Sequence, residues 1–442
     1  MHRIAVIGAG YVGLVTAACL AELGNSVVCI DADVNKIAKL ARDESPFYEP
    51  GLAELVRRNQ QAGRLAFTSD VPAGVKDRDI IFIAVGTPTS SDGQLDLRYV
   101  RQAALDIAAA LDGPKIVVNK STVPVQTADL VASLIEEAKI AGHAVSVVSN
   151  PEFLREGSAV ADFMHPDRIV IGVDHAGAEA VLRDLYAPLG APIIVTDPRT
   201  AEMIKLTSNA FLATKISFIN EIAALCDAVG ADVRDVVAGA GADKRIGAAC
   251  MQPGLGFGGS CLPKDVLALL QIAKRSGTSV QLLDAALAVN SAQVDFVAAR
   301  LATLVGGVRG KTIGVLGLAF KPGTDDVRES PAIALVRLLV RDGGIVQAHD
   351  PASGANAKRE LGDALRIVDG PYDAASGAAA LAVATAWNEY VELDLAELRR
   401  RMSGDVLFDA RDVYDPRKVV EAGFTYAGIG RNARAPARVP AP

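Results

Sequence analysis

A glycine-rich segment that ends in a cysteine is the part of this sequence best suited to covalent chemistry. Residues 254–265 read GLGFGGSCLPKD, and glycines at four of the first six positions allow a ligand to approach the backbone closely. Pro263 suits the first turn of a helix, which places Cys261 near that helix's N-terminus. A helix N-terminus lowers the pKa of a thiol and favours the nucleophilic thiolate. Cys261 is therefore the candidate nucleophile, and the alternative is a small residue in a turn.

Three polar side chains accompany this cysteine in the sequence pattern. Asp265 follows Cys261 by four residues and shares its helical face. Because a carboxylate beside a thiol disfavours the thiolate, we expect Asp265 to orient a water or a cation. Lys205 and Asn209 place an ammonium and an amide on one face of an otherwise apolar helix. If Lys205 is buried it needs a carboxylate or a developing oxyanion as partner, and the alternative is a lysine that reaches solvent.

Two carboxylates and two threonines follow apolar runs that read as strands. Glu152 and Glu156 lie four residues apart in NPEFLREG, and either is a candidate general base unless both lie on a solvated helix face. Thr87 in VGTPT and Thr122 in KSTVP also follow strands, where an open α/β sheet binds its ligand. They are candidate donors to a ribose or a water, and the alternative is a capping or turn threonine.

The N-terminus carries the pattern of a dinucleotide-binding turn. Gly8, Gly10 and Gly13 form a GxGxxG motif between an apolar strand and a helix pattern. The helix N-terminus offers free N–H groups to a pyrophosphate. Asp31 ends the second strand, 18 residues after Gly13, where a carboxylate can accept from both ribose hydroxyls and repels a 2′-phosphate. The pattern predicts NAD rather than NADP, with FAD or an empty turn as the alternatives.

These motifs are positioned by a strand–helix alternation that predicts an α/β fold with two Rossmann-like, doubly wound parallel sheets. The predicted N-terminal strands are 3–7, 26–31, 80–85, 115–119, 145–149, 169–172 and 193–195. A long helix over 201–229 and helical patterns from 263 and over 281–305 follow. Such helices between domains often form a homodimer seam, and the alternative is packing within one chain. Alternation returns at residue 311 with KTIGVLGLAF, which keeps the first glycine of the turn but not the second and third. Predicted strands over 345–349, 380–385 and 406–408 follow.

The chain is therefore expected to divide into four parts. We predict an NAD-binding Rossmann domain over 1–200, a helical dimerisation segment over 201–305, a second Rossmann-like domain over 306–430 and a disordered tail over 431–442. The tail is rich in proline, alanine and arginine and has no periodicity.

Composition excludes several classes of protein. The 442 residues are 50% hydrophobic and 22% charged, with a net charge of −7, which rules out disorder for the bulk of the chain. The acidic balance argues against nucleic acid or an anionic membrane as partner, and no apolar window is long enough to predict a transmembrane span. Five widely spaced cysteines without CxxC predict a reduced, cytoplasmic protein with no disulfide framework and no metal site.

Ten motifs in order make the sequence closely resemble the UDP-glucose 6-dehydrogenases of the UDP-glucose/GDP-mannose dehydrogenase family. The resemblance runs from residue 2 to about 430 and includes GAGYVG, FYEPGL, VGTPT, STVP, NPEFLREGSA, KLTSNAF, DKRIG, GFGGSCLPKD, FKPGTDDVRES and FDARDVYDP. It implies NAD-dependent, four-electron oxidation of UDP-glucose to UDP-glucuronate. Siblings that act on GDP-mannose or UDP-N-acetyl-mannosamine share the cysteine loop, and a non-catalytic nucleotide-sugar sensor is a further alternative.

The resemblance also implies a role for each candidate residue. Cys261 forms a thiohemiacetal and then a thioester with the sugar carbon, which water hydrolyses. Lys205 and Asn209 stabilise oxyanions, and Glu152 is the general base. Asp265 and Thr122 hold a water near the sugar C6.

Ligand-binding residues follow from the same resemblance. The residues implied to bind NAD are Gly8, Gly10, Tyr11, Val12, Gly13, Asp31, Lys36, Thr87, Thr122, Glu156, Lys264 and Arg328. The residues implied to bind the UDP-sugar are Glu152, Phe153, Leu154, Arg155, Glu156, Lys205, Asn209, Arg245, Gln252, Pro253, Gly254, Leu255, Gly256, Gly258, Phe320, Lys321 and Arg411. Arg245 is implied to reach the neighbouring subunit's site in a homodimer.

Overall fold

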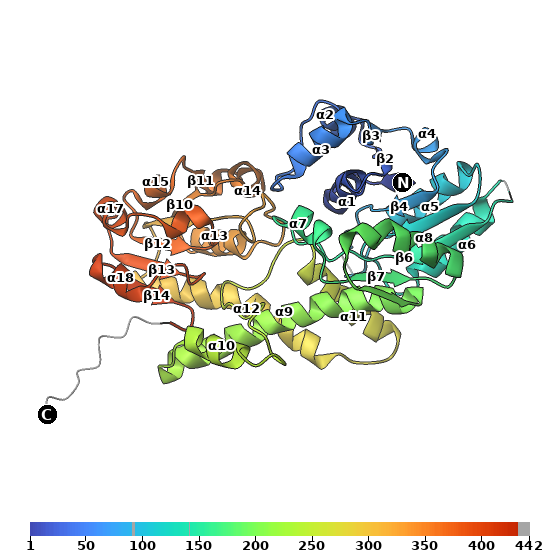
Figure 1. Ribbon diagram of the computed structural model, residues 1–442. Coiled ribbons are helices and arrows are strands. Elements are labelled where there is room, and N and C mark those ends of the chain that lie inside the picture. The colour runs from blue at the N-terminus through green and yellow to red at the C-terminus, as the bar shows by residue number, and fades with distance from the viewer. Residues whose placement is uncertain (91–92, 141, 432–442) are drawn as a thin grey trace. The chain divides into compact units, whose positions relative to one another are not determined.

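The computed structural model describes residues 1–90, 93–140 and 142–431, and they fold into two compact units. Unit 1 contains Met1–Ser208 and Leu267–Thr278, and unit 2 contains Asn209–Val266 and the chain from Ser279 onward. Each unit is built on one β-sheet, and Figure 1 follows the order of the elements.

Unit 1 holds an eight-stranded sheet in the order β3-β2-β1-β4-β5-β6-β7-β8. Its strands are β1 (Arg3–Ile7), β2 (Ser26–Ile30), β3 (Leu65–Thr68), β4 (Ile80–Ile83), β5 (Lys115–Asn119), β6 (Val145–Ser149), β7 (Ile169–Gly172) and β8 (Ile193–Thr196). Its helices are α1 (Tyr11–Glu22), α2 (Val34–Leu40), α3 (Leu52–Gln61), α4 (Val71–Val75), α5 (Arg98–Ala109), α6 (Thr127–Ala138), α7 (Ala159–Met164) and α8 (Ala176–Tyr186). The first six strands of the order are parallel, whereas β7 pairs with β6 antiparallel and with β8 parallel.

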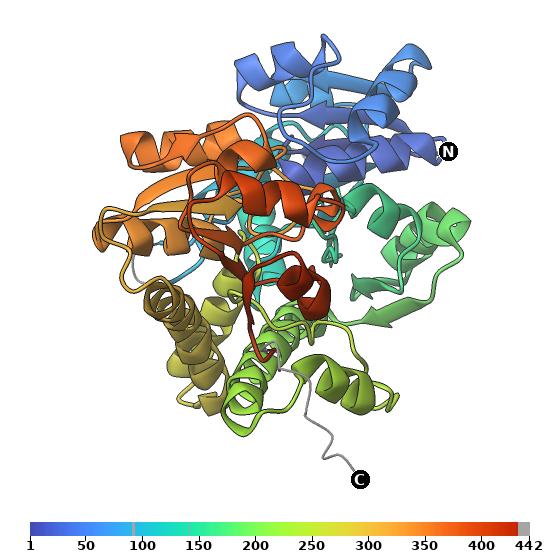
Figure 2. The same cartoon turned by 90° about the vertical axis from the view of Figure 1, so that its left-hand side faces the viewer.

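Unit 2 repeats the first six positions of that order as β11-β10-β9-β12-β13-β14, all parallel. The strands are β9 (Thr312–Leu316), β10 (Ile345–His349), β11 (Arg366–Ile367), β12 (Ala380–Val383), β13 (Val406–Asp409) and β14 (Thr425–Gly428). The helices are α13 (Pro331–Arg341), α14 (Gly354–Leu361), α15 (Pro371–Ala375), α16 (Asn388–Val391), α17 (Leu395–Arg401) and α18 (Pro416–Glu421), and Figure 2 shows helices on both sides of this sheet.

Alternate residues of the central strands pack into two different apolar cores, as expected for sheets covered on both faces. In unit 1, Phe82 belongs to one core and Ile83 to the other. In unit 2, Ala382 belongs to one core and Leu381 to the other. The predicted pair of doubly wound α/β units is confirmed by these two sheets.

Four helices form the central segment of the chain. They are α9 (Pro198–Val229), α10 (Val233–Gly241), α11 (Leu262–Arg275) and α12 (Gln281–Leu304). Helix α12 has the length and hydropathy of a membrane span, a property that core helices share, and it contributes Val294, Val297 and Leu301 to the core of unit 2.

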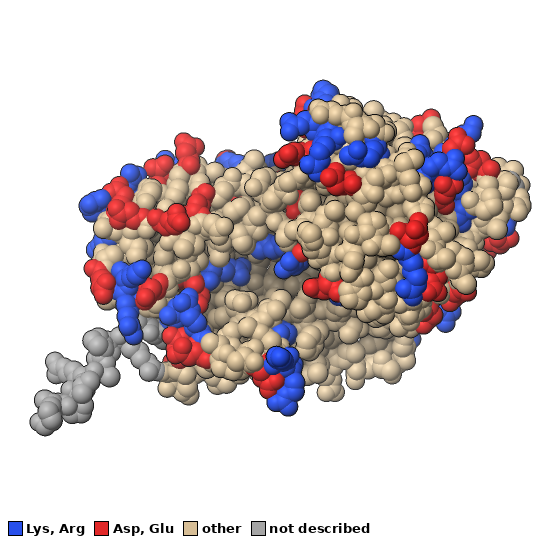
Figure 3. Space-filling view, in the orientation of Figure 1, with Lys and Arg blue, Asp and Glu red and all other residues tan. Residues whose placement is uncertain are grey.

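The predicted tail falls almost wholly outside the described residues, which end at Arg431. The side chain of Arg431 forms ion pairs with Asp232 and Asp412. Over the face shown in Figure 3, basic and acidic side chains are interspersed, so neither sign of charge covers a large region there.

Candidate active site

The glycine turn of unit 1 has the shape that a dinucleotide requires. Gly13 sits so close to the preceding strand turn that a Cβ would lie 1.8 Å from the Gly8 carbonyl oxygen. A Cβ on Gly10 would meet nothing within 4 Å, which leaves open space at the N-terminus of α1. The residues present therefore fit a pyrophosphate held by backbone N–H groups.

Asp31 lies directly after β2, as predicted, and is tied to the turn. One of its carboxylate oxygens, Oδ2, accepts from the Ala9 N–H at 2.8 Å and from the Lys36 ammonium at 2.8 Å. Burial alone raises the pKa of Asp31, but these bonds and one from the Asp33 N–H together hold that pKa below its usual value. A carboxylate that stays ionised can accept from a ribose, which fits the predicted use of NAD.

The corresponding turn of unit 2 has a different chemistry. Gly317 follows β9 as Gly8 follows β1, and Asp350 follows β10 as Asp31 follows β2. The Asp350 carboxylate accepts from the N–H groups of Leu318 and Ala319 at 2.7 and 3.1 Å, and from the Trp387 indole at 3.1 Å. In this turn the Asp350 carboxylate, a side chain of the protein, thus accepts from the backbone N–H groups.

The cysteine loop in unit 2 is clamped by amide side chains that the sequence analysis did not single out. Asn290 of α12 accepts from the Phe257 N–H at 2.7 Å and donates to the Phe257 carbonyl at 3.0 Å. Asn220 of α9 and Gln293 of α12 bind the Gly254 N–H and carbonyl, each at 2.8 Å. Gly258 passes so near the Glu329 carbonyl that a Cβ would lie 2.1 Å from it, so only glycine fits there. Polar residues inside apolar helices were the available signal for these clamps.

Cys261 is at the N-terminus of α11, as the proline pattern predicts. Its carbonyl accepts from the Asp265 N–H at 2.9 Å, which is the first hydrogen bond of that helix. The thiol is partly exposed, and its sulfur is 3.6 Å from the Ser260 hydroxyl.

Asp265 is fully buried and is held by two partners in unit 2. The Asn209 amide donates to its Oδ2 at 2.6 Å, and the Lys264 ammonium lies 2.9 Å from Oδ1 without hydrogen-bond alignment. The expectation that Asp265 orients a cation fits this contact with Lys264. Asn209 and Asp265, both predicted site residues, are therefore in direct contact.

Lys205 and Glu152 form a buried ion pair in unit 1, with an Nζ–Oε1 distance of 3.0 Å and both side chains 4% exposed. The carboxylate that a buried Lys205 requires is thus Glu152. Residues 151–155 are not helical, so Glu152 and Glu156, both buried, do not form a solvated helix face.

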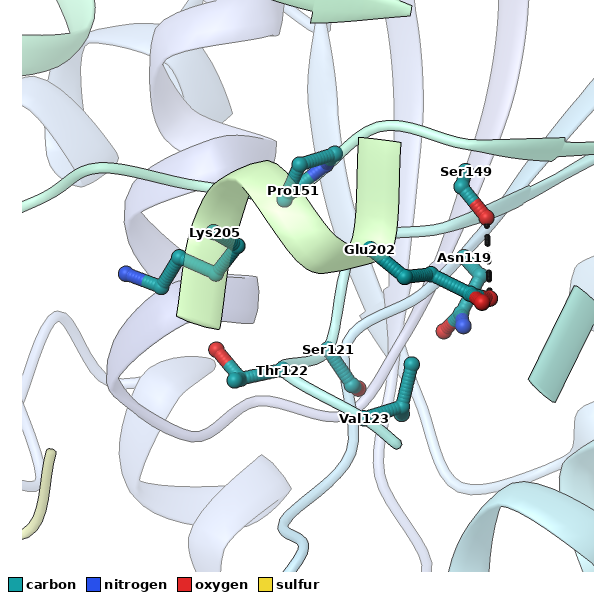
Figure 4. Close-up of a pocket in the computed structure, with 8 residues that line it drawn as sticks. All are labelled: Asn119, Ser121, Thr122, Val123, Ser149, Pro151, Glu202 and Lys205. Atoms are coloured by element: carbon teal, nitrogen blue, oxygen red, sulfur yellow. Dashed lines mark hydrogen bonds between the residues drawn. The ribbon is translucent and has the colours of Figure 1, made fainter. Parts of the chain in front are cut away.

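A small cavity of about 10 Å³ lies at the carboxyl ends of β5 and β6 (Figure 4). Its lining includes the predicted residues Lys205 and Thr122, and the Thr122 hydroxyl lies on the same side as Lys205 in that view. Thr122 also accepts, through its carbonyl, from the Thr87 hydroxyl at 2.7 Å. The two predicted threonines and the lysine thus meet at one sheet edge.

Glu49, in the FYEPGL motif, holds the loop that carries Glu152 and Glu156. Its carboxylate accepts from the N–H groups of Gly157 and Ala159 at 2.6 and 2.7 Å, and from the Tyr11 hydroxyl. The motif was visible in the sequence, but its contact with residues more than 100 positions away was not.

A largely buried arginine in unit 2 lies against the cysteine loop. The Arg411 Nε donates to the Ala384 carbonyl at 2.7 Å, whereas its buried Nη2 has no hydrogen-bond partner among the described atoms. A Cβ on Gly254 would lie 2.8 Å from Nη1. Burial lowers the pKa of Arg411 to about 10. A buried cation with a free donor is suited to a phosphate.

Three predicted basic residues instead lie at the surface beside local carboxylates. Arg155, Arg245 and Arg328 have side chains 72%, 89% and 65% exposed, and each pairs with an aspartate within seven positions in the sequence. Lys321 lies with its ammonium 5.6 Å from the ring centroid of Phe320. Within the described ranges, no group of three or more His, Cys, Asp or Glu side chains is arranged to hold a metal ion.

The glycine turn and the carboxylate after β2 are those of the NAD-dependent oxidoreductases. The sequence matches three domain models of the UDP-glucose/GDP-mannose dehydrogenase family: the NAD binding domain over residues 2–190, the central domain over 199–292 and the UDP binding domain over 314–416. The chain belongs to this family.

Similar proteins of known name cover nearly the whole chain. UDP-glucose 6-dehydrogenase TuaD of Bacillus subtilis is 47% identical to this chain, and the alignment covers 98% of this chain and 94% of TuaD. UDP-glucose 6-dehydrogenase of Rhizobium meliloti is 49% identical, and the alignment covers 97% of this chain and 99% of that protein. The structure of a UDP-glucose dehydrogenase from Pyrobaculum islandicum superposes with a TM-score of 0.91, at 42% identity over 97% and 98% of the two chains.

Proposed function

We propose that this protein oxidises UDP-glucose to UDP-glucuronate with two molecules of NAD⁺. The observation that carries the proposal is Cys261 at the N-terminus of α11, in a loop clamped by Asn220, Asn290 and Gln293. The named relatives, at 47% and 49% identity over nearly the whole chain, support UDP-glucose as the sugar nucleotide.

In this proposal the sulfur of Cys261 retains the sugar carbon between two oxidations. When bound by the Gly8–Gly13 turn and Asp31, NAD⁺ would accept the hydride in each oxidation, the first of which converts the C6 alcohol to an aldehyde. The Cys261 thiolate adds to the C6 aldehyde and forms a C–S bond, which gives a thiohemiacetal and, after the second oxidation, a thioester. Water then adds to the carbonyl carbon, the C–S bond breaks and the thiolate leaves. A tethered carbon cannot escape as the reactive aldehyde.

The buried charged groups take the remaining roles. Glu152 accepts the proton of the hydrolytic water, and Lys205 and Asn209 donate to the oxyanions that develop at C6. Asp265, which binds Asn209 at 2.6 Å, orients that amide and, with Thr122, a water near C6. Arg411 and Lys321 neutralise the diphosphate.

Comparing three sugar nucleotides tests the substrate. Purified protein is assayed with UDP-glucose, GDP-mannose and UDP-N-acetyl-mannosamine, and NADH is counted per molecule of sugar nucleotide consumed. We expect two NADH per UDP-glucose and the highest kcat/KM with that substrate. A higher kcat/KM with either of the others would assign the chain to a sibling activity, and absence of NADH with all three would indicate a sensor.

Asp31→Ala is expected to weaken NAD binding by about 1–3 kcal/mol, the range for a lost charged hydrogen bond. The measurement is calorimetric titration of NAD into the free protein, so it does not depend on turnover. The control is Asp33→Ala, which removes a neighbouring carboxylate whose contacts are with the N-terminus of α2. Equal affinity in Asp31→Ala and the wild type would place the ribose contact elsewhere.

We also propose that the protein is a homodimer through α9. Phe211, Phe218 and Leu225 recur every seven residues on this helix and are 64%, 52% and 59% exposed, so they form an apolar stripe on one helix face. A second copy of the same stripe is the partner that a two-fold seam requires. Arg245, which the family resemblance assigns to the neighbouring site, has a side chain that is 89% exposed and pairs with Asp243, so reaching a partner subunit would exchange that contact for a new one.

Phe218→Glu is expected to convert the dimer to a monomer, because two like charges would face each other at a two-fold seam. Light scattering after size-exclusion chromatography gives the mass directly. Ile345→Glu is the matched control, since Ile345 is 57% exposed on β10 in unit 2. A Phe218→Glu variant that kept the mass of the wild type would exclude α9 as the seam.

The remaining assignments are also part of this proposal. We retain an NAD-binding part over 1–200, a dimerisation segment over 201–305 and a UDP-sugar part over 306–430. None of the five cysteines, all within the described residues, forms a disulfide, which supports a cytoplasmic location.

A further inference from the structure

The protein has a second buried lysine besides Lys205, and the proposal above gives it no role. Lys120 directly follows β5 and is 6% exposed. Its ammonium is 3.1 Å from the Asn150 side-chain oxygen, and 6.0 and 5.9 Å from the ring centroids of Phe163 and Tyr186. No carboxylate in the described part of the chain forms an ion pair with it at contact distance. A buried cation held only by an amide oxygen and aromatic faces is costly, and such a cost is usually maintained for function.

The amide that holds Lys120 also fixes the start of the Glu152 loop. The Asn150 side-chain oxygen that Lys120 contacts also accepts from the Tyr186 hydroxyl at 2.5 Å. The side-chain N–H of Asn150 donates to the Val170 carbonyl at 2.7 Å. Its backbone N–H donates to the Asn119 carbonyl at 2.9 Å. Glu152 is two residues further along, so the position of its backbone depends on the same bonds that hold Lys120.

Charge links the two lysines with Glu152. Burial lowers the pKa of Lys120 to about 8, the charge of Glu152 opposes that change, and the charge of Lys205 adds to it. Tyr186, whose ring lies near this ammonium, is also titratable, and burial raises the pKa of its phenol well above the usual value. Two buried cations therefore act on one buried carboxylate.

We propose that Lys120 is a positioning residue that keeps Glu152 ionised and oriented for the hydrolysis of the Cys261 thioester. The inference rests on the proposed function, in which Glu152 is the general base. In that step water adds to the thioester carbon, its proton passes to the Glu152 carboxylate, the C–S bond breaks and the Cys261 thiolate leaves. Lys120 gains and loses no proton in this step and acts only through its charge and through Asn150.

The charge of Lys120 has a measurable consequence for pH dependence. Without it, Glu152 keeps Lys205 as its partner but loses the attraction of a second cation. The acid limb of the hydrolysis rate then moves to higher pH by on the order of one pH unit. Below that limb the rate constant falls about tenfold, whereas above it the rate approaches that of the wild type.

The test is the pH profile of acyl-enzyme hydrolysis in the full-length protein with UDP-glucose and saturating NAD⁺. Rapid acid quench followed by mass spectrometry measures the fraction of Cys261 that carries the acyl group. Lys120→Met is expected to accumulate acylated Cys261 at low pH, because the acid limb of its hydrolysis rate lies at higher pH than in the wild type. Its KM for UDP-glucose should stay within about twofold of the wild type. Lys120→Arg, which keeps the charge, should restore the limb.

Two further variants separate charge from packing. Tyr186→Phe removes the other hydroxyl on Asn150 and keeps the Lys120 charge, so its acid limb should not move. If Lys120→Met does not fold, Lys120→Gln keeps a donor toward Asn150 without the charge and should show the same shift. An unshifted limb in the uncharged variants, or an equal shift in Tyr186→Phe, would overturn the inference.

Glu152→Gln distinguishes this inference from the proposed function. If Glu152→Gln accumulates the adduct at every pH while the uncharged Lys120 variants behave like the wild type, the base stands and the role of Lys120 is wrong. If Glu152→Gln hydrolyses the adduct normally, Glu152 is not the base, and the role of Lys120 falls with it.

Discussion

Cys261→Ser is expected to stop production of the acid, with steady-state NADH formation reduced at least about 1,000-fold, on the scale of losing a nucleophile. A serine hydroxyl at the N-terminus of α11 remains protonated at neutral pH, whereas a thiol there is favoured as thiolate. An ester formed by serine would also hydrolyse more slowly than a thioester, because an alkoxide is the poorer leaving group. NADH formation and UDP-glucuronate release are measured on the same samples.

Cys250→Ser is the matched control for this prediction. Cys250 is partly exposed and precedes the same loop, but it lies outside α11 and its helix N-terminus. We expect kcat within about twofold of the wild type for Cys250→Ser. Full turnover by Cys261→Ser would remove sulfur from the mechanism, and loss of turnover in both variants would indicate damage to the loop rather than to the nucleophile.

Arg411→Met is expected to reduce the affinity for UDP at least about 30-fold, since removing one partner of a buried charge contact costs about 2–5 kcal/mol. The buried Nη2 of Arg411, without a partner in the protein, is a donor that a diphosphate would satisfy. Titration of UDP into the free protein measures this loss without turnover.

The same substitution should have little effect on stability, because two effects oppose each other. Methionine removes a largely buried, unpaired charge, which favours folding. It also removes the 2.7 Å bond from Nε to the Ala384 carbonyl, at a cost of about 1–3 kcal/mol. We expect the free energy of unfolding to change by less than about 2 kcal/mol.

Arg417→Met is the control, because Arg417 is exposed on α18 and carries the same charge. It should bind UDP within about twofold of the wild type. If Arg411→Met binds UDP normally, the diphosphate is held by other residues. If the variant unfolds, the expected small change in the free energy of unfolding is wrong.

Strands with strong local patterns were predictable, and strands that depend on their neighbours were not. Arg3–Ile7 and Lys115–Asn119 are continuous apolar runs between helical patterns, and both are confirmed as β1 and β5. β3 and β14 have four residues each and β11 only two, and they were missed. These short strands lie at a sheet edge in the orders given above, and they are defined by pairing with β2, β13 and β10.

The two doubly wound sheets, the long helix α9 and the candidate groups of the site could be predicted from the sequence, because apolar periodicity and motif spacing are local properties. Which of these groups come into contact could not be predicted and is seen only in the folded chain. Glu152 pairs with Lys205 from 53 positions away, Asn209 binds Asp265 across 56, and Glu49 holds Ala159 across 110. Such pairs form because a buried charge or amide must find a partner, and chain folding, rather than spacing along the sequence, determines which partner is within reach.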